Sequence, residues 1–129
     1  MYLFVYGTLM RKCKTNEWSV YLQKNAKYLG EAKVKGELYK IDFYPGLVSG
    51  DDWVYGEVYQ LKNTESTLHF LDQYEDYQEG DTENSLYLRQ ETSVVLLKEK
   101  KSLQCTTYYY NKSIEGLIKY TDGKFSEAL

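Results

Sequence analysis

An alternation of side-chain character over residues 29 to 41 constrains the fold of this chain more than any other feature. Small or apolar residues occupy one set of alternate positions and charged residues the other: Ala32, Val34, Gly36 and Leu38 against Glu31, Lys33, Lys35 and Glu37. Successive side chains of a β-strand point to opposite faces, so a period of two indicates a strand with one buried and one solvated face. We therefore expect a fold built on a sheet.

Similar patterns predict the other elements. Strands are expected at residues 2 to 6, 53 to 61, 86 to 97 and 103 to 110, and helices from Thr15 to about Lys24 and from Asn63-Thr64 to about Tyr77. Tyr44-Pro45-Gly46 has the residues of a turn, and the tail from Ser113 shows little periodicity. Neighbouring strands are joined by short links, which favours antiparallel pairing. We expect an α+β fold in which a curled or closed sheet packs against two helices.

Composition limits the class of protein. A length of 129 residues suits one domain over residues 1–129, and no apolar stretch is long enough for a transmembrane helix. The first residues lack the basic and apolar regions of a signal peptide, so we expect a cytoplasmic protein without a membrane partner. A net charge of -3 argues against nucleic acid as a partner, because binding to a phosphate backbone needs clustered Lys and Arg.

Most familiar catalytic and metal-binding motifs are absent. The chain contains no GxGxxG, P-loop or HExxH sequence. Cys13 and Cys105 lie far apart without a CxxC spacing, which indicates two free thiols and neither a zinc site nor a disulfide. His69, the only histidine, has no obvious nucleophile near it in the sequence, so a dyad with either cysteine is a minor alternative.

One acidic residue interrupts the apolar stripe of the second predicted helix. Leu68 and Leu71 lie on this stripe, and Glu75 occupies a following position by helical spacing. A carboxylate on a packing face is costly unless it is paired or protonated. In an aromatic pocket its pKa rises, as general acid–base catalysis near neutral pH requires. The alternative is a glutamate at the helix end that reaches solvent or pairs with Arg89.

The turn after the first strand is a second candidate site. Tyr6-Gly7-Thr8-Leu9 leaves a buried strand through a glycine, so successive backbone N–H groups can converge on a small anion or a carbonyl oxygen. A purely structural turn fits the same residues. Later in the chain, Tyr108-Tyr109-Tyr110 alternates on a predicted strand, where tyrosines usually pack and one or two are available to hydrogen-bond a ligand.

Six short blocks follow one another along the chain: Phe4-Val5-Tyr6-Gly7-Thr8-Leu9, Gly36-Glu37-Leu38-Tyr39, Tyr44-Pro45-Gly46-Leu47, Val54-Tyr55-Gly56-Glu57-Val58-Tyr59, Leu71-Asp72-Gln73-Tyr74-Glu75 and Tyr87-Leu88-Arg89. In this order they resemble the γ-glutamylcyclotransferase-like family, from residue 3 to about 125. The resemblance implies a small mixed, mainly antiparallel β-barrel flanked by helices. It also implies an enzyme that converts a γ-glutamyl amine or γ-glutamyl amino acid to 5-oxoproline and the free amine, without a metal or cofactor.

The resemblance further implies roles for two parts of the chain. The loop Tyr6-Gly7-Thr8-Leu9 would hold the glutamyl part of the substrate, and Glu75 would be the catalytic acid and base. The backbone N–H groups of Gly7, Thr8 and Leu9 would bind either the substrate α-carboxylate or the developing oxyanion. Glu75 is thus indicated both by helical periodicity and by the resemblance.

The resemblance also implies residues that line the rest of the expected cavity. Three tyrosines are implied to bind substrate there: Tyr39, Tyr87 and Tyr110. Arg89 either anchors a carboxylate or pairs with the acidic loop, with the structural role favoured. Lys12 and Asp76 stand where family members commonly have glycine, and both differences bear on the choice of substrate.

Two other classes of function compete with this one. A binding protein for a small amino-acid-like metabolite would keep the cavity but would form no product that depends on Glu75. A tyrosine-rich surface can also stack on single-stranded nucleic acid or contact another protein, although the negative net charge weighs against nucleic acid. The leading expectation is a small-molecule γ-glutamyl substrate.

Overall fold

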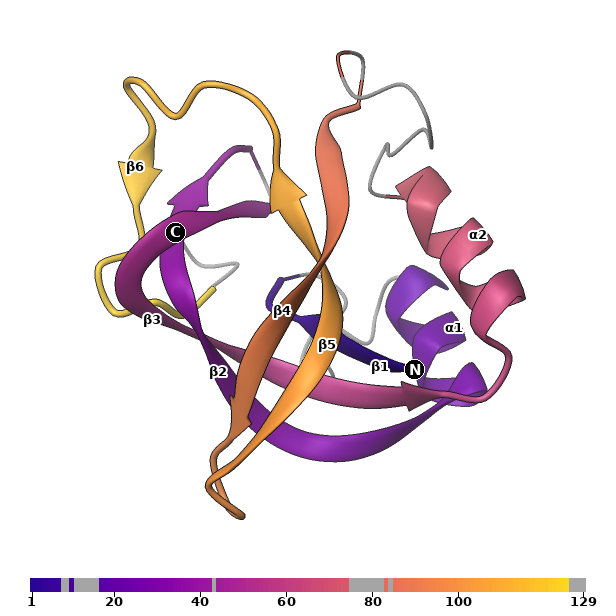
Figure 1. The fold of residues 1–129 in the computed structure, drawn as a ribbon. Coiled ribbons are helices and arrows are strands. Elements are labelled where there is room, and N and C mark those ends of the chain that lie inside the picture. The colour runs from indigo at the N-terminus through magenta and orange to yellow at the C-terminus, as the bar shows by residue number, and fades with distance from the viewer. Residues whose placement is uncertain (8–9, 11–16, 43, 75–82, 84, 126–129) are drawn as a thin grey trace.

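The computed structural model describes residues 1–7, 10, 17–42, 44–74, 83 and 85–125 (Figure 1). The elements in these residues are β1 Tyr2–Val5, α1 Glu17–Asn25, β2 Ala26–Lys40, β3 Pro45–Leu61, α2 Thr64–Tyr74, β4 Tyr87–Leu96, β5 Lys101–Tyr110 and β6 Ile118–Lys119. Their order matches the prediction of strand, helix, two strands, helix and two strands. The short β6 lies in the tail, where two residues are too few to produce a periodic pattern. The predicted α+β class is confirmed.

The strands form one mixed, mainly antiparallel sheet. β2 pairs with β3 along most of its length, and β4 and β5 form a second antiparallel hairpin. β5 also runs parallel to β1 and β3, at a single register pair in each case: Leu3 with Thr106, and Leu47 with Tyr109. Because these two links are so short, the sheet curls around its interior without forming a strict barrel, and of the expected curled or closed sheet the curled form is present.

The alternation that predicted β2 is confirmed by burial. The four small or apolar residues, Ala32, Val34, Gly36 and Leu38, are buried, whereas Glu31 and Lys35 are exposed. The strand begins earlier than predicted, at Ala26, directly after α1. A register shift between Tyr28 and Gly30, where Gly30 has a φ of 147°, breaks the period-two pattern, so the first residues of the strand carry no visible alternation.

The turn predicted at Tyr44-Pro45-Gly46 overlaps the turn in the structure only at Tyr44, because β2 ends at Lys40 and β3 begins at Pro45. The hydrogen bonds of the observed turn join the amides of Ile41 and Asp42 to the carbonyl of Tyr44, and β3 then starts at Pro45. Proline is accepted as the first residue of a strand because no ladder hydrogen bond is lost there. β3 is therefore longer than the predicted strand at 53 to 61, and Pro45 and Gly46 belong to the sheet.

The two helices lie side by side against one part of the sheet (Figure 1). The rings of Tyr21 in α1 and Phe70 in α2 stack with centroids 4.0 Å apart. Leu68 and Leu71, which define the predicted apolar stripe of α2, are buried. Within the described residues, neither helix has the length and hydrophobicity needed to cross a membrane.

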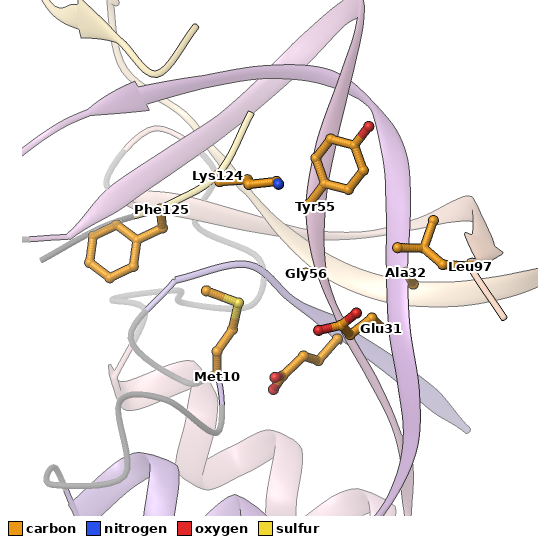
Figure 2. Close-up of a pocket in the computed structure, with 9 residues that line it drawn as sticks. Met10, Glu31, Ala32, Tyr55, Gly56, Leu97, Lys124 and Phe125 are labelled. Carbon is orange, nitrogen blue, oxygen red and sulfur yellow. The ribbon is translucent and has the colours of Figure 1, made fainter. Parts of the chain in front are cut away.

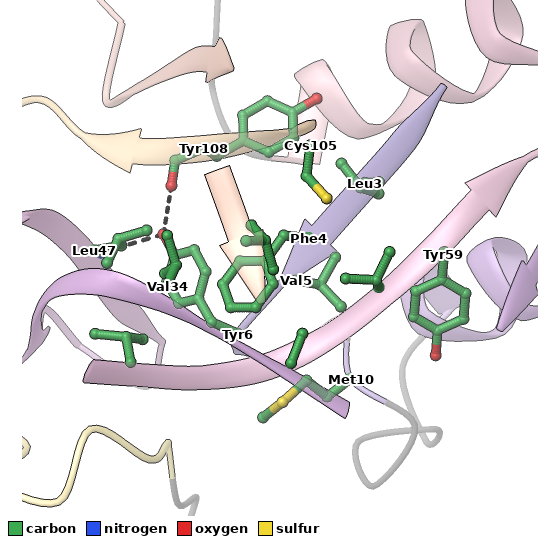
Figure 3. Close-up of a cluster of buried hydrophobic side chains, with 14 of the residues drawn as sticks. Leu3, Phe4, Val5, Tyr6, Met10, Val34, Leu47, Tyr59, Cys105 and Tyr108 are labelled. Carbon is green, nitrogen blue, oxygen red and sulfur yellow. Dashed lines mark hydrogen bonds between the residues drawn. The ribbon is translucent and has the colours of Figure 1, made fainter. Parts of the chain in front are cut away.

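Side chains from β1, β2, β3 and β5 fill the interior of the curled sheet (Figure 3). Phe4, Val34 and Tyr59 are almost completely buried in this core. Cys105 is a free thiol in the same cluster, and burial raises its pKa to about 11, so it stays protonated at neutral pH. The other cysteine, Cys13, lies outside the described residues.

Candidate active site

Several of the predicted site residues contact the start of β3. We call its first three residues, Pro45, Gly46 and Leu47, the Pro45–Leu47 segment. The Leu47 amide donates to the hydroxyl oxygen of Tyr6 at 3.2 Å. A Cβ atom on Gly7 would lie 2.7 Å from Cγ of Pro45, so only glycine allows the loop to pass this close. The end of β1 is therefore fixed against the start of β3. Thr8 and Leu9, which follow Gly7, lie outside the described residues.

Tyr87 and Tyr110 contact the same segment from β4 and β5. The Tyr87 hydroxyl donates to the Pro45 carbonyl at 2.6 Å, and the ring of Tyr87 meets that of Tyr110 edge-on with centroids 5.6 Å apart. Gly46 leaves room for Tyr110, since a Cβ atom there would lie 2.8 Å from Cβ of Tyr110. Tyr44 adds a third ring, 6.3 Å from Tyr87. Together they build an aromatic wall on the segment.

Replacing Tyr87 by phenylalanine is expected to destabilise the protein by about 1–2 kcal/mol, because the buried Pro45 carbonyl then loses its donor. Urea unfolding of the variant measures this loss. Tyr109→Phe is the matched control, since it makes the same change at a partly buried tyrosine of the neighbouring strand β5. Equal stability of Tyr87→Phe and Tyr109→Phe would show that the hydrogen bond to Pro45 is not important.

Tyr39 differs from the other predicted tyrosines. Its backbone lies opposite Gly46 in the β2–β3 register, but its hydroxyl donates to Oε1 of Glu37 at 2.8 Å. This hydrogen bond to a carboxylate is the main reason why the pKa of Tyr39 is raised. Lys119 of β6 lies 4.0 Å from the same carboxylate. Tyr39 is thus next to the segment, with its hydroxyl committed to a polar cluster.

Arg89 and Asp72 form an ion pair that the sequence did not predict. Nη1 of Arg89 lies 2.8 and 3.1 Å from the two carboxylate oxygens of Asp72. The Tyr108 hydroxyl donates to Oδ1 of Asp72 at 2.6 Å. We call these three residues the Asp72 cluster. Pairing of Arg89 with the acidic loop, the structural role expected from the sequence, concerns residues that mostly lie outside the described part of the chain; the partner that is described is Asp72 of α2.

The Asp72 cluster is joined to the loop at Gly7 through the backbone of β5. The carbonyl of Tyr108 accepts a hydrogen bond from the Tyr6 hydroxyl at 2.6 Å (Figure 3). Tyr6 thus bridges β5 and Leu47 of β3. The sequence carried one signal for this cluster: Asp72 belongs to the Leu71–Glu75 block, at the edge of the apolar stripe of α2. Glu75, the predicted catalytic residue, lies outside the described residues, immediately after Tyr74.

The arrangement determines which groups can serve a ligand. The hydroxyls of Tyr6 and Tyr87 donate to backbone carbonyls, so these side chains hold the Pro45–Leu47 segment in place. The rings of Tyr6 and Tyr87 are buried, whereas those of Tyr44 and Tyr110 are partly exposed. Such a site offers shape and main-chain dipoles, and it needs a separate acid or base for proton transfer.

A hollow of about 300 Å³ lies elsewhere on the sheet, between β2, β3 and the chain near Phe125 (Figure 2). Glu31 and Glu57 face each other across β2 and β3 in its lining. Lys124 lies on another side, with Nζ 5.3 Å from the centroid of the Tyr55 ring. None of the described residues that line this hollow belongs to the aromatic wall of Tyr44, Tyr87 and Tyr110.

The residues that were considered for other chemistry lie apart. His69 is exposed on α2, with Nε2 3.4 Å from the amide nitrogen of Gln73, whereas Cys105 is buried in the core. No hydrogen bond joins His69 to Cys105, so these two do not form a dyad. Among the described residues, no group of three or more His, Cys, Asp or Glu side chains is placed to hold a metal ion.

Comparisons with known proteins agree on one family. The family model described as "Gamma-glutamyl cyclotransferase, AIG2-like" matches residues 3–127. A γ-glutamylcyclotransferase family protein, ytfP of Citrobacter rodentium, is 32% identical over 126 residues, which is 97% of this chain and 95% of the relative.

Solved structures show the same fold. The solution structure of ytfP from Escherichia coli has a TM-score of 0.67 and 30% identity, and the match covers 97% of this chain and 96% of that protein. The crystal structure of YkqA from Bacillus subtilis has a TM-score of 0.68 and 26% identity, covering 96% of this chain but 39% of that one.

Proposed function

The chain belongs to the γ-glutamyl cyclotransferase, AIG2-like family, and from this membership we propose that it is an enzyme that cyclises a γ-glutamyl compound. The substrate is a γ-glutamyl amine or γ-glutamyl amino acid, and the products are 5-oxoproline and a free amine. We assign the reaction to a single domain that spans residues 1–129 and needs no cofactor. Glu75 is the proposed general acid and base.

One observation supports this proposal most directly. Four of the residues expected in the substrate site, Tyr6, Gly7, Tyr87 and Tyr110, all contact the Pro45–Leu47 segment. Tyr6 and Gly7 directly follow β1, whereas Tyr87 begins β4 and Tyr110 ends β5, so three distant parts of the sequence meet there. An aromatic wall beside a glycine-containing turn suits a small substrate with an apolar chain and an anionic group.

The proposed reaction is an intramolecular amide exchange. The α-amine of the substrate attacks its own γ-carbonyl carbon, a C–N bond forms in a five-membered ring, and the amide C–N bond to the leaving amine breaks. Glu75 takes the proton that the α-amine loses and returns it to the leaving nitrogen. Because both reacting groups belong to one molecule, holding the folded substrate conformation supplies much of the acceleration.

The loop after β1 has the second role in this mechanism. The backbone N–H groups of Gly7, Thr8 and Leu9 bind either the α-carboxylate, which anchors the substrate, or the oxyanion that forms at the γ-carbonyl. The tight contact of Gly7 with Pro45 fixes where this loop leaves the sheet. The partly exposed ring of Tyr110, the outer part of the aromatic wall, packs against the methylene chain of the glutamyl group.

The proposal predicts that the protein releases 5-oxoproline from at least one member of a panel of γ-glutamyl amino acids and γ-glutamyl amines. Chromatography with mass detection measures the product. The same substrates with an acetylated α-amine are the control, because they lack the nucleophile and must remain intact. A ligand that binds tightly and is recovered unchanged across the panel would favour the binding-protein alternative and contradict the enzymatic one.

A further inference from the structure

The last turn of α2 is attached to the sheet by one carboxylate. Asp72 accepts hydrogen bonds from Arg89 of β4 and from Tyr108 of β5, and both its oxygens are used. The ion pair is mostly shielded from water, since the side chains of Arg89 and Asp72 are 21% and 17% exposed. Charge-assisted hydrogen bonds in such a position are stronger than those of neutral groups.

The attachment continues to the candidate substrate site. The backbone carbonyl of Tyr108 accepts a hydrogen bond from the Tyr6 hydroxyl. The oxygen of this hydroxyl accepts a hydrogen bond from the Leu47 amide (Figure 3). Tyr108, Tyr6 and Leu47 are 2%, 7% and 0% exposed, so water does not readily replace these hydrogen bonds. A hydrogen-bonded path therefore runs from α2 to the residue before Gly7 and to the Pro45–Leu47 segment.

An aspartate is needed at this position for a chemical reason. A carboxylate accepts hydrogen bonds at both oxygens, as Arg89 and Tyr108 require. Asparagine has nearly the same shape, but its NH₂ group is a donor and would face one of these two donors. Removing the charge therefore breaks part of the Asp72 cluster without creating a cavity.

We propose that Asp72 is a positioning residue, which holds the end of α2 in register with the loop at Gly7 and with the Pro45–Leu47 segment. Glu75 follows Asp72 by three positions in the sequence, so the same attachment sets where the chain leaves α2. The catalytic part of this inference rests on the proposed function. Its structural part, the coupling between Asp72 and Leu47, does not.

Kinetics test the catalytic part. Asp72→Asn is expected to lower kcat about tenfold, equivalent to about 1.4 kcal/mol in the barrier, with little change in KM, because the substrate still binds but is misplaced relative to the acid–base. Glu65→Gln is the matched control, since it removes a negative charge from an exposed residue in the first turn of the same helix. An unchanged kcat in Asp72→Asn, or an equal loss in Glu65→Gln, would overturn the positioning role.

A double-mutant cycle separates positioning from a general loss of stability. Tyr108→Phe removes one donor to Asp72 and leaves the Tyr108 carbonyl in place. If both residues act through one cluster, the effects of Asp72→Asn and Tyr108→Phe on kcat are less than additive. Fully additive effects would contradict a shared role.

Amide hydrogen exchange tests the coupling without any activity. Exchange of the Leu47 amide, which reports its hydrogen bond to Tyr6, is expected to be several-fold faster in Asp72→Asn than in Glu65→Gln or the wild type. Equal exchange in all three would overturn the coupling. If the wild type releases no 5-oxoproline from any substrate while Leu47 exchange still responds to Asp72, the proposed function fails and the coupling stands.

Discussion

Replacing Glu75 by glutamine is expected to reduce the rate of 5-oxoproline release by at least about a hundredfold, the usual contribution of a general acid–base group. Glutamine keeps the shape of the side chain but cannot take a proton from the α-amine or return it to the leaving nitrogen. Ring closure then depends on water for both transfers. Because glutamine leaves the substrate contacts in place, kcat should fall far more than KM rises. Steady-state kinetics on the best substrate of the panel give both constants.

Glu65 in the first turn of α2 supplies the matched control. Glu65→Gln makes the same chemical change at an exposed residue, so any effect of net charge on substrate binding appears in both variants. The proposed role requires that Glu65→Gln keep most of the activity. Comparable activity of Glu75→Gln and the wild type would remove Glu75 from the mechanism even if the protein is an enzyme.

Replacing Gly56 by alanine is expected to destabilise the protein strongly, by about 3 kcal/mol. The added Cβ would overlap the Val5 carbonyl oxygen and would lie 2.8 Å from Cζ of Phe4. Val5 is paired with Glu57 of β3, so its carbonyl cannot move without breaking the β1–β3 ladder. Urea unfolding, followed by circular dichroism, measures the lost free energy of unfolding.

Gly50 in the same strand allows a controlled comparison. The three atoms nearest to a Cβ there all belong to the Glu37 side chain, with Cγ at 2.7 Å, and this side chain can shift at the cost of its hydrogen bond from Tyr39. Gly50→Ala is therefore expected to cost much less than Gly56→Ala, although both replace a glycine in β3. Similar losses in the two variants would show that the backbone contact at Val5 is not the cause.

Local pattern predicted the elements of this fold well wherever one face of an element is buried. The alternation in β2 and the stripe of Leu68 and Leu71 in α2 follow directly from burial of one face. The pattern failed at Gly30, where a bulge interrupts the alternation near the start of β2. It also failed at Pro45 and Gly46, which are typical turn residues but belong to β3. Both errors arise because pairing with β3 and β2 overrides local preference.

The site was predicted less completely, because its contacts join distant parts of the sequence. Tyr87 and Pro45 are separated by 42 positions, and Tyr6 and Tyr108 by 102. A helix pattern marks Asp72 as a residue at the edge of the stripe, but its partners depend on how β4 and β5 pack against α2. The resemblance to a family supplied Tyr6, Gly7, Tyr87 and Tyr110, and their shared contact with the Pro45–Leu47 segment became visible only in the structure.

The contact between β1 and β5 has a consequence for biosynthesis. The Thr107 hydroxyl donates to the Phe4 carbonyl, across a sequence separation of 103. At a translation rate of about 5–20 residues per second, β1 is synthesised on the order of 5–20 s before β5. β1 can pair with β3 during this time, but Tyr6 gains its acceptor only when Tyr108 has been made. The substrate site is therefore completed among the last steps of folding, and the nascent chain has no competent site while most of its sheet is already present.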